Sequence, residues 1–231
     1  NSMRGGPSTG LPTKTEQGDL FQAIGASQGD FPKVIIAPST IEDCFYSTIE
    51  AFNLADQFQI PVIILSDLFL SEHMESIGDL DFNSTIERGE IVTSNDSDKL
   101  YRRFQYTDTG VSPRAFPGTS GTVFQASSDE HDDYGNIISD VFTDSETRIK
   151  IMLKRMRKMK FIAEQLPAAK LEGPADADLT IVSWGSTYNV VHEAIQILQN
   201  NSKSVNHLHI KYLIPLQKGI KEILPNRKDT L

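Results

Sequence analysis

The amino-acid sequence predicts an α/β fold in which short buried strands alternate with amphipathic helices. Residues 33–38 (KVIIAP) and 60–67 (IPVIILSD) are apolar runs rich in β-branched residues, as expected of buried strands. The segment 39–59 between them repeats its apolar residues at helical spacing and starts with Ser39 or Thr40, either of which can cap a helix. A strand, a helix and a second buried strand form a βαβ unit, whose sheet is expected to be parallel.

The last part of the chain has the same order of elements. We predict a strand at 179–186, a helix at 187–201, a strand at 205–213 and a further helix at 218–224. The Pro-, Ala- and Gly-rich segment 167–178 precedes this unit and is typical of a linker. We therefore expect two partial domains, at 1–166 and 176–231.

The remaining segments are less regular. Residues 13–30 are predicted to form a helix that leaves an N-terminal loop. The stretch 78–143 is rich in Asp, Ser, Thr and Gly, and we expect an irregular excursion with a short strand at 90–94. Residues 145–166 are predicted to form one long helix, imperfectly capped by Ser145, with its basic residues facing solvent.

The composition limits the class of partner. The chain has 231 residues, a net charge of −9 and an isoelectric point of about 5.0. This acidic balance argues against nucleic acid or an anionic membrane as the main binding partner. Cys44 is the only cysteine, so these residues alone can form neither a disulfide nor a cysteine-ligated iron–sulfur cluster. No apolar run reaches the roughly 20 residues of a membrane span, and no signal-peptide pattern is present. We expect a cytoplasmic protein whose given sequence begins inside a domain.

The loop of residues 4–13, RGGPSTGLPT, is the first candidate functional site. Gly5 and Gly10 have the spacing of a phosphate-binding Walker loop. However, Leu11 and Pro12 stand where that loop needs a lysine and a hydroxyl residue, and proline also removes a backbone donor. The sequence therefore excludes a Walker loop.

Arg4 suggests a different ligand for this loop. An arginine held by glycines can bind a carboxylate through two parallel hydrogen bonds, and Thr9 and Thr13 can add hydroxyl contacts. Such a site would position a small carboxylic acid and orient its reacting end. The alternative is a tight structural turn in which Arg4 forms a salt bridge.

Two further polar segments allow alternatives. Residues 129–133 (DEHDD) contain metal-ligand residue types but only one histidine, so we predict a hydrogen-bonded turn and no metal site, with His131 as a possible acid or base. Residues 184–187 (WGST) connect a predicted strand to a helix and could bind an anion. We favour a helix cap by Ser186 or Thr187.

The remaining candidate side chains are predicted to be structural. His192, His207 and His209 are scattered through the second unit, and we expect them at the surface or the edge of the core. Cys44 lies within a predicted helix and is expected to be a buried small apolar residue.

Six segments of the chain together resemble a known family. RGGPSTGLPTKTEQGDL, PKVIIAPSTIEDCF, PVIILSDLFLSE, PRAFPGTSGTVFQASSDEHDDYG, RIKIMLKRMRKM and WGSTYNVVHEAI occur in this order. The chain is similar to the alpha subunit of 2-oxoacid:ferredoxin oxidoreductases of the 2-oxoglutarate type. The resemblance covers most of the chain, and the 4–13 loop is its most specific part.

The resemblance implies a fold, a reaction and a set of partners. The expected fold is the later part of a pyrimidine-type thiamine-diphosphate-binding domain, followed by the start of a transketolase C-terminal-like domain. Members convert a 2-oxoacid and coenzyme A to an acyl-CoA and CO₂ and pass electrons to ferredoxin. Thiamine diphosphate with magnesium is shared with a beta subunit, and iron–sulfur clusters lie on other subunits. By position, the resemblance implies that Arg4 contacts the substrate carboxylate and that Thr13 lies at the same site.

The sequence also departs from the family pattern. The YPITPS-type substrate motif, the glutamate that activates the thiamine ring and the GDG…N diphosphate motif are not found. We therefore expect no catalytic residue in this chain, no activity of the isolated chain, and continuation of the natural subunit at both ends. Two alternatives are a non-catalytic α/β module that docks a partner, and a self-contained anion-binding enzyme of flavodoxin-like architecture.

Overall fold

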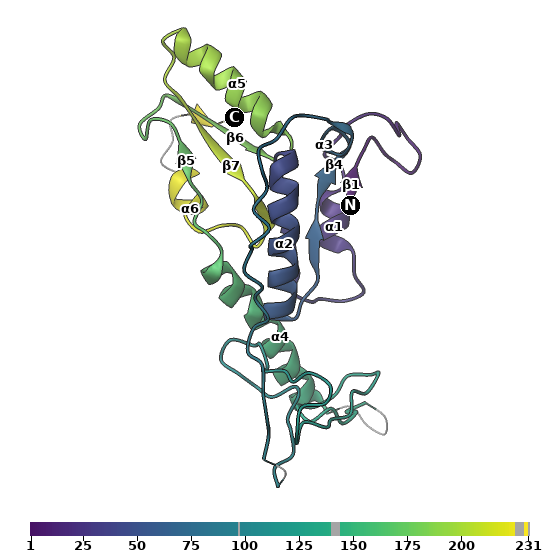
Figure 1. Cartoon of the computed structure of the whole chain (residues 1–231). Coiled ribbons are helices and arrows are strands. Elements are labelled where there is room, and N and C mark those ends of the chain that lie inside the picture. The colour runs from purple at the N-terminus through teal and green to yellow at the C-terminus, as the bar shows by residue number, and fades with distance from the viewer. Residues whose placement is uncertain (97, 140–143, 225–228, 231) are drawn as a thin grey trace.

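The computed structural model describes residues 1–96, 98–139, 144–224 and 229–230 (Figure 1). Its helices are α1 (Leu20–Gly25), α2 (Ile41–Phe58), α3 (Leu68–Glu72), α4 (Ser145–Gln165), α5 (Thr187–Asn200) and α6 (Ile220–Ile223). Its strands are β1 (Ser2–Met3), β2 (Val34–Ile36), β3 (Val62–Ile64), β4 (Ser66–Asp67), β5 (Leu171–Glu172), β6 (Leu179–Trp184), β7 (Val205–Ile210), β8 (Tyr212–Ile214) and β9 (Asp229–Thr230). The end of the expected second domain, at 225–228 and 231, lies outside the described residues.

The sheets confirm the predicted parallel βαβ units. β2 and β3 pair in parallel and are connected by α2, and β6 and β7 pair in parallel and are connected by α5. β1 also pairs in parallel with β4. β8 joins the first unit, because it pairs antiparallel with β2. The expectation of one strand at 205–213 is therefore wrong: this segment is divided between two sheets.

The core lies on both faces of β2. Val34 and Ile36 pack against α2 and α4, including Phe58 and Ile162, while Ile35 lies in a second cluster that contains Met3 of β1. All six of these side chains are fully buried. Burial on both faces explains why this strand has a continuous apolar sequence.

The start of α2 follows the prediction closely. The Thr40 hydroxyl accepts a hydrogen bond from the Asp43 amide (3.0 Å), and acidic side chains occupy the first turn. Asp43 also forms an ion pair with Lys211, which precedes β8 (2.7 Å), and Lys211 lies 3.4 Å from Glu50. These contacts attach the C-terminal unit to α2.

Several predicted boundaries were wrong. The expected helix over 13–30 is reduced to α1, because the residues before Asp19 belong to the hydrogen-bonded loop and its exit. No strand forms at 90–94, where Ile91 makes only an isolated bridge to Arg114. The cap of α4 is Asp144, whose carboxylate accepts from the Thr147 amide, and not Ser145.

The basic residues of α4 do not all face solvent, contrary to expectation. Lys154 is buried and Lys158 is half-buried, whereas the apolar side chains of Ile149 and Met156 are exposed. The helix turns this part of its basic face toward the 78–143 excursion, as Lys154 donates to the Phe104 carbonyl. Among the helices that the structure describes, none is long and apolar enough to cross a membrane.

Candidate functional site at the carboxyl edge of the first unit

The 4–13 loop begins at the carboxyl end of β1. The parallel partner of β1 is β4, which ends at Asp67, so both strands finish at the same edge. In Figure 1 the loop projects from this edge, beside α3. Ligands of open α/β sheets bind outside the carboxyl ends of the strands, so the loop occupies the usual position for a binding site.

Backbone hydrogen bonds fold the loop tightly. The Gly5 amide donates to the Lys14 carbonyl (2.9 Å), and the Leu11 amide donates to the Gly5 carbonyl (2.8 Å). Gly10 has a φ of +44°, and a Cβ there would lie 2.7 Å from the carbonyl carbon of Gly6. Only glycine fits this position without moving the backbone.

Arg4 is held within this loop. Its side chain is half-buried, and Nη1 donates to the Thr9 carbonyl. Among the described residues no carboxylate lies within ion-pair distance of Arg4, so the salt bridge of the alternative interpretation is not found there. A guanidinium has five N–H donors, and the remaining ones can bind a carboxylate. Thr9 and Thr13 are exposed on the same loop.

Two residues that were not predicted from the sequence, Asp67 and Gln17, connect the 4–13 loop and β4 to the turn between β6 and α5. Asp67 is almost fully buried, and its carboxylate accepts from the Leu70 amide (3.0 Å) and the Ser186 hydroxyl (2.5 Å). Gln17, at the loop exit, donates to the Trp184 carbonyl (3.0 Å). The turn between β6 and α5 therefore braces both β4 and the end of the loop. In the sequence, the indication of such a contact is the acidic residue Asp67 at the end of the apolar run 60–67.

The same contacts correct the prediction for the 184–187 turn. The Ser186 hydroxyl binds Asp67, and the Thr187 hydroxyl donates backward to the Trp184 carbonyl (2.7 Å). Neither side chain accepts a hydrogen bond from the first turn of α5, so the predicted cap is wrong. The polar residues of this turn join the two units.

Cys44 lies in the first turn of α2 and is half-buried, so the expectation of a buried apolar residue is only partly met. Burial, and then the negative charges of Asp43 and Asp67, raise the pKa of its thiol. Because the thiolate is the reactive form, Cys44 is a poor nucleophile here.

Residues 129–133 form the predicted polar turn. The Asp132 carboxylate accepts from the amides of Tyr134 and Asn136, both at 2.9 Å. In the part of the chain that the structure describes, no three His, Cys, Asp or Glu side chains are grouped to hold a metal. His131 belongs to the 78–143 excursion and lines a pocket together with Gln59, the residue that follows the C-terminal end of α2.

Among the histidines of the second unit, His192 and His209 have the predicted surface or core-edge positions and His207 does not. His192 is exposed, but His207 is fully buried and lies 2.7 Å from the Ser183 hydroxyl through Nε2. His209 Nδ1 lies 3.2 Å from the same hydroxyl. Burial, and then the neighbouring His207, lower the pKa of His209 to about 4. This imidazole is therefore neutral near pH 7 and has a structural role between β6 and β7.

The geometry defines an α/β protein with a hydrogen-bonded, arginine-containing loop at the carboxyl edge of its parallel strands. The family described as "Pyruvate flavodoxin/ferredoxin oxidoreductase, thiamine diP-bdg" matches residues 1–151. The chain belongs to this family, which confirms the resemblance and the expected fold class.

Individual relatives agree with this assignment. The chain is 38% identical over 226 residues to "2-oxoacid:ferredoxin oxidoreductase 2, subunit alpha" of Aeropyrum pernix, which covers 95% of this chain and 34% of that protein. It is 32% identical over 232 residues to "2-oxoglutarate oxidoreductase subunit KorA" of Mycobacterium tuberculosis, covering 96% and 33%. The chain thus spans about a third of the length of these curated relatives.

A solved structure also matches the fold. It is a "2-oxoglutarate:ferredoxin oxidoreductase from Magnetococcus marinus with 2-oxoglutarate, coenzyme A and succinyl-CoA bound". The TM-score is 0.87 at 32% identity, and the match covers 99% of this chain and 39% of that chain. The arrangement of elements described above is therefore that of this family.

Proposed function

We propose that this chain is part of the alpha subunit of a 2-oxoacid:ferredoxin oxidoreductase. The enzyme would convert a 2-oxoacid and coenzyme A to an acyl-CoA and CO₂, and pass the electrons to ferredoxin. The observation that carries the proposal is the 4–13 loop, which holds Arg4 without a carboxylate partner among the described residues, at the edge where α/β folds bind ligands.

Arg4 would bind the carboxylate of the 2-oxoacid. Two parallel hydrogen bonds from one guanidinium fix both the position and the plane of a carboxylate. The hydroxyls of Thr9 and Thr13, exposed on the same loop, would donate to the substrate from the side. These contacts orient the 2-oxo carbon toward the reacting centre and convert binding energy into correct alignment.

The carboxylate that Arg4 binds is lost during the reaction. A contact that stabilised the bound substrate more than the transition state would slow decarboxylation. The hydrogen bond from the Arg4 side chain to the Thr9 carbonyl holds the guanidinium within the loop. Arg4 would therefore position the substrate, and no catalytic proton transfer is assigned to it.

Thiamine diphosphate, when bound, supplies carbanion stabilisation at the 2-oxo carbon. The described residues do not fit the magnesium that accompanies its diphosphate, because they contain no suitable group of His, Cys, Asp or Glu side chains. We propose that the beta subunit holds the magnesium and diphosphate, and that iron–sulfur clusters lie on other subunits. No reaction step is assigned to this chain through these groups.

The proposed partners follow from the same assignment. They are a beta subunit, ferredoxin reached through the complex, the 2-oxoacid and coenzyme A, in a cytoplasmic enzyme. Residues 1–166 and 176–231 would be the two partial domains, although β8 joins the sheet of the first. The 184–187 turn, which contacts both Asp67 and Gln17, supports a fixed arrangement of the two.

The experiment is an activity assay of the full-length subunit assembled with its beta partner. Reduction of a viologen dye is followed with a panel of 2-oxoacids, each with and without coenzyme A and thiamine diphosphate. We expect reduction that requires both, with one preferred 2-oxoacid. If an intact complex loaded with its clusters reduces no dye with any 2-oxoacid, the enzyme assignment is wrong and the interaction-module alternative replaces it.

A further inference from the structure

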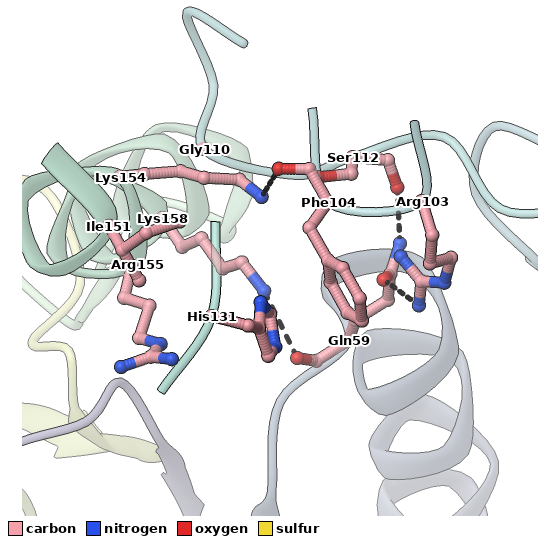
Figure 2. Close-up of a pocket in the computed structure, with 10 residues that line it drawn as sticks. All are labelled: Gln59, Arg103, Phe104, Gly110, Ser112, His131, Ile151, Lys154, Arg155 and Lys158. Atoms are coloured by element: carbon pink, nitrogen blue, oxygen red, sulfur yellow. Dashed lines mark hydrogen bonds between the residues drawn. The ribbon is translucent and has the colours of Figure 1, made fainter. Parts of the chain in front are cut away.

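A cavity of about 220 Å³ lies where α4 meets the end of α2 and the 78–143 excursion (Figure 2). Arg103 lines it from the excursion, and Lys154, Arg155 and Lys158 line it from α4. We call it the lysine pocket. Its volume is far above the roughly 10–15 Å³ that one water molecule needs, so a small ion with part of its hydration shell can enter.

Three of the four cations of the lysine pocket, Arg103, Lys154 and Lys158, contact only neutral acceptors. Lys154 is 7% exposed, and its Nζ donates to the Phe104 carbonyl (2.7 Å). Lys158 Nζ donates to the Gln59 carbonyl (3.1 Å), and Arg103 donates to the Gln59 side chain (2.7 Å). Within the described residues no carboxylate lies in ion-pair distance of the three. Buried charges in proteins are normally paired, so this arrangement is costly without a counter-ion.

Glu130, which pairs with the lining residue Arg155, does not supply a counter-ion to the other three cations. Glu130 binds Arg155 through both carboxylate oxygens (2.6 and 2.9 Å) and also contacts Arg148. In Figure 2 the Arg155 guanidinium extends away from the two lysine ammonium groups. His131 also lines the pocket and packs its ring against Phe104 at 4.0 Å between centroids. The positive charge of the pocket is therefore not balanced by Glu130.

Burial and the surrounding positive charges lower the pKa values of both lysines. Burial, and then the positive charges of Lys158, Arg103 and Arg155, lower the pKa of Lys154 to about 7. Burial, and then Arg103 and Arg155, lower the pKa of Lys158 to about 8. A bound anion would reverse this repulsion and favour the charged lysines.

We propose that the lysine pocket binds a phosphate group, held by Arg103, Lys154 and Lys158. A phosphate offers several strong acceptor oxygens, and the three cations that line the pocket have N–H donors beyond those used for the Phe104 and Gln59 acceptors. The phosphate can be inorganic or the phosphoryl group of a small phosphomonoester. Bound there, it would connect the excursion to α4 and stabilise both.

This site is independent of the proposed function. α2 has 18 residues, so its two ends are about 27 Å apart at 1.5 Å per residue. Gln59, at the end of α2, lines the lysine pocket, whereas the 4–13 loop lies at the other end (Figure 1). One site can therefore be wrong without affecting the other.

Calorimetry on the intact complex tests the proposal, with inorganic phosphate and glycerol 3-phosphate as separate probes in phosphate-free buffers at pH 8. We expect saturable binding at millimolar phosphate. Because the empty lysines are partly neutral at this pH, binding should take up protons, so the measured enthalpy should depend on the ionisation enthalpy of the buffer. Tighter binding of glycerol 3-phosphate than of phosphate would identify a phosphomonoester as the natural source, and the reverse order would identify the free ion.

Three variants make the test specific. Lys158→Gln and Arg103→Gln should each weaken the binding at least tenfold and reduce the phosphate-induced rise in Tm. Lys160→Gln, on an exposed position of the same helix, should leave both unchanged. Circular dichroism of each variant establishes that it is folded. The proposal is overturned if folded Lys158→Gln and Arg103→Gln proteins bind phosphate as wild type does, or if wild type binds none.

Discussion

Replacing Gly10 by alanine tests whether the shape of the 4–13 loop is needed for substrate binding. A residue with a Cβ at φ +44° costs roughly 1–2 kcal/mol. The added Cβ would also lie 2.7 Å from the Gly6 carbonyl carbon, well inside the roughly 3.5–4.0 Å of a carbon–carbon contact. The loop can relieve this overlap only by moving, which separates the Thr9 carbonyl from Arg4.

Because the loop is exposed, such a movement should lower the free energy of unfolding by only about 1–2 kcal/mol. A displacement of about 1 Å at the guanidinium, in contrast, can cost on the order of 100-fold in rate. We therefore expect Gly10→Ala to lose at least about tenfold in kcat/KM for the 2-oxoacid in the viologen assay, with a Tm lowered by only a few degrees. Gly6→Ala is the matched control, since a Cβ there meets nothing within 4 Å. Wild-type kcat/KM in Gly10→Ala would refute the reasoning.

Three further predictions concern the support of the site. Ser186→Ala leaves the buried Asp67 carboxylate with one donor fewer and should cost about 1–3 kcal/mol of unfolding free energy in urea titrations, whereas an unchanged midpoint would contradict this contact. Burial raises the pKa of Asp43. The positive charge and hydrogen bond of Lys211, together with hydrogen bonds from Ser39 and Ser47, outweigh burial and hold this pKa below the ordinary 3.8. The ionised Asp43 therefore contributes stability that is complete above pH 3.8 and is lost as the pH falls through the pKa of the folded state. Lys211→Met should lower the free energy of unfolding at pH 7 and much less at pH 2–3. An equal loss at both pH values would argue against the Asp43–Lys211 pair. Thr40→Ala should cost about 0.5–2 kcal/mol through the lost α2 cap, and Thr40→Ser should restore most of it.

The parallel units and the loop could be predicted because their signals are local in the sequence. The apolar run at 33–38 and the Thr40 cap each depend on a few adjacent residues, and both are found as expected. The 4–13 loop stood out through residues that suit neither a helix nor a strand. Its location at the carboxyl edge followed only from the pairing of β1 with β4.

The contacts between distant segments could not be predicted. Asp67 and Ser186 are 119 residues apart, and no spacing rule connects them. The lysine pocket was missed because the basic run of α4 suggested a solvated face, while the excursion that buries Lys154 has no periodic pattern. Propensity and periodicity describe one element at a time, whereas burial depends on which elements meet.

The carboxylate-binding role of Arg4 is the central claim, and one series of variants tests it most directly. In the intact complex, kcat/KM for the preferred 2-oxoacid is measured for Arg4→Ala, Arg4→Lys and Lys14→Ala, with and without added guanidinium. Lys14 is the other cation of the loop region and is exposed, so its variant controls for charge alone.

We expect Arg4→Ala to lose at least about tenfold in kcat/KM, which corresponds to about 1.4 kcal/mol. Arg4→Lys should recover only part of this loss, because an ammonium cannot bind a carboxylate in a planar fork. Guanidinium should partly rescue Arg4→Ala, and Lys14→Ala should behave as wild type. A folded, assembled Arg4→Ala enzyme with wild-type kcat/KM would contradict the account.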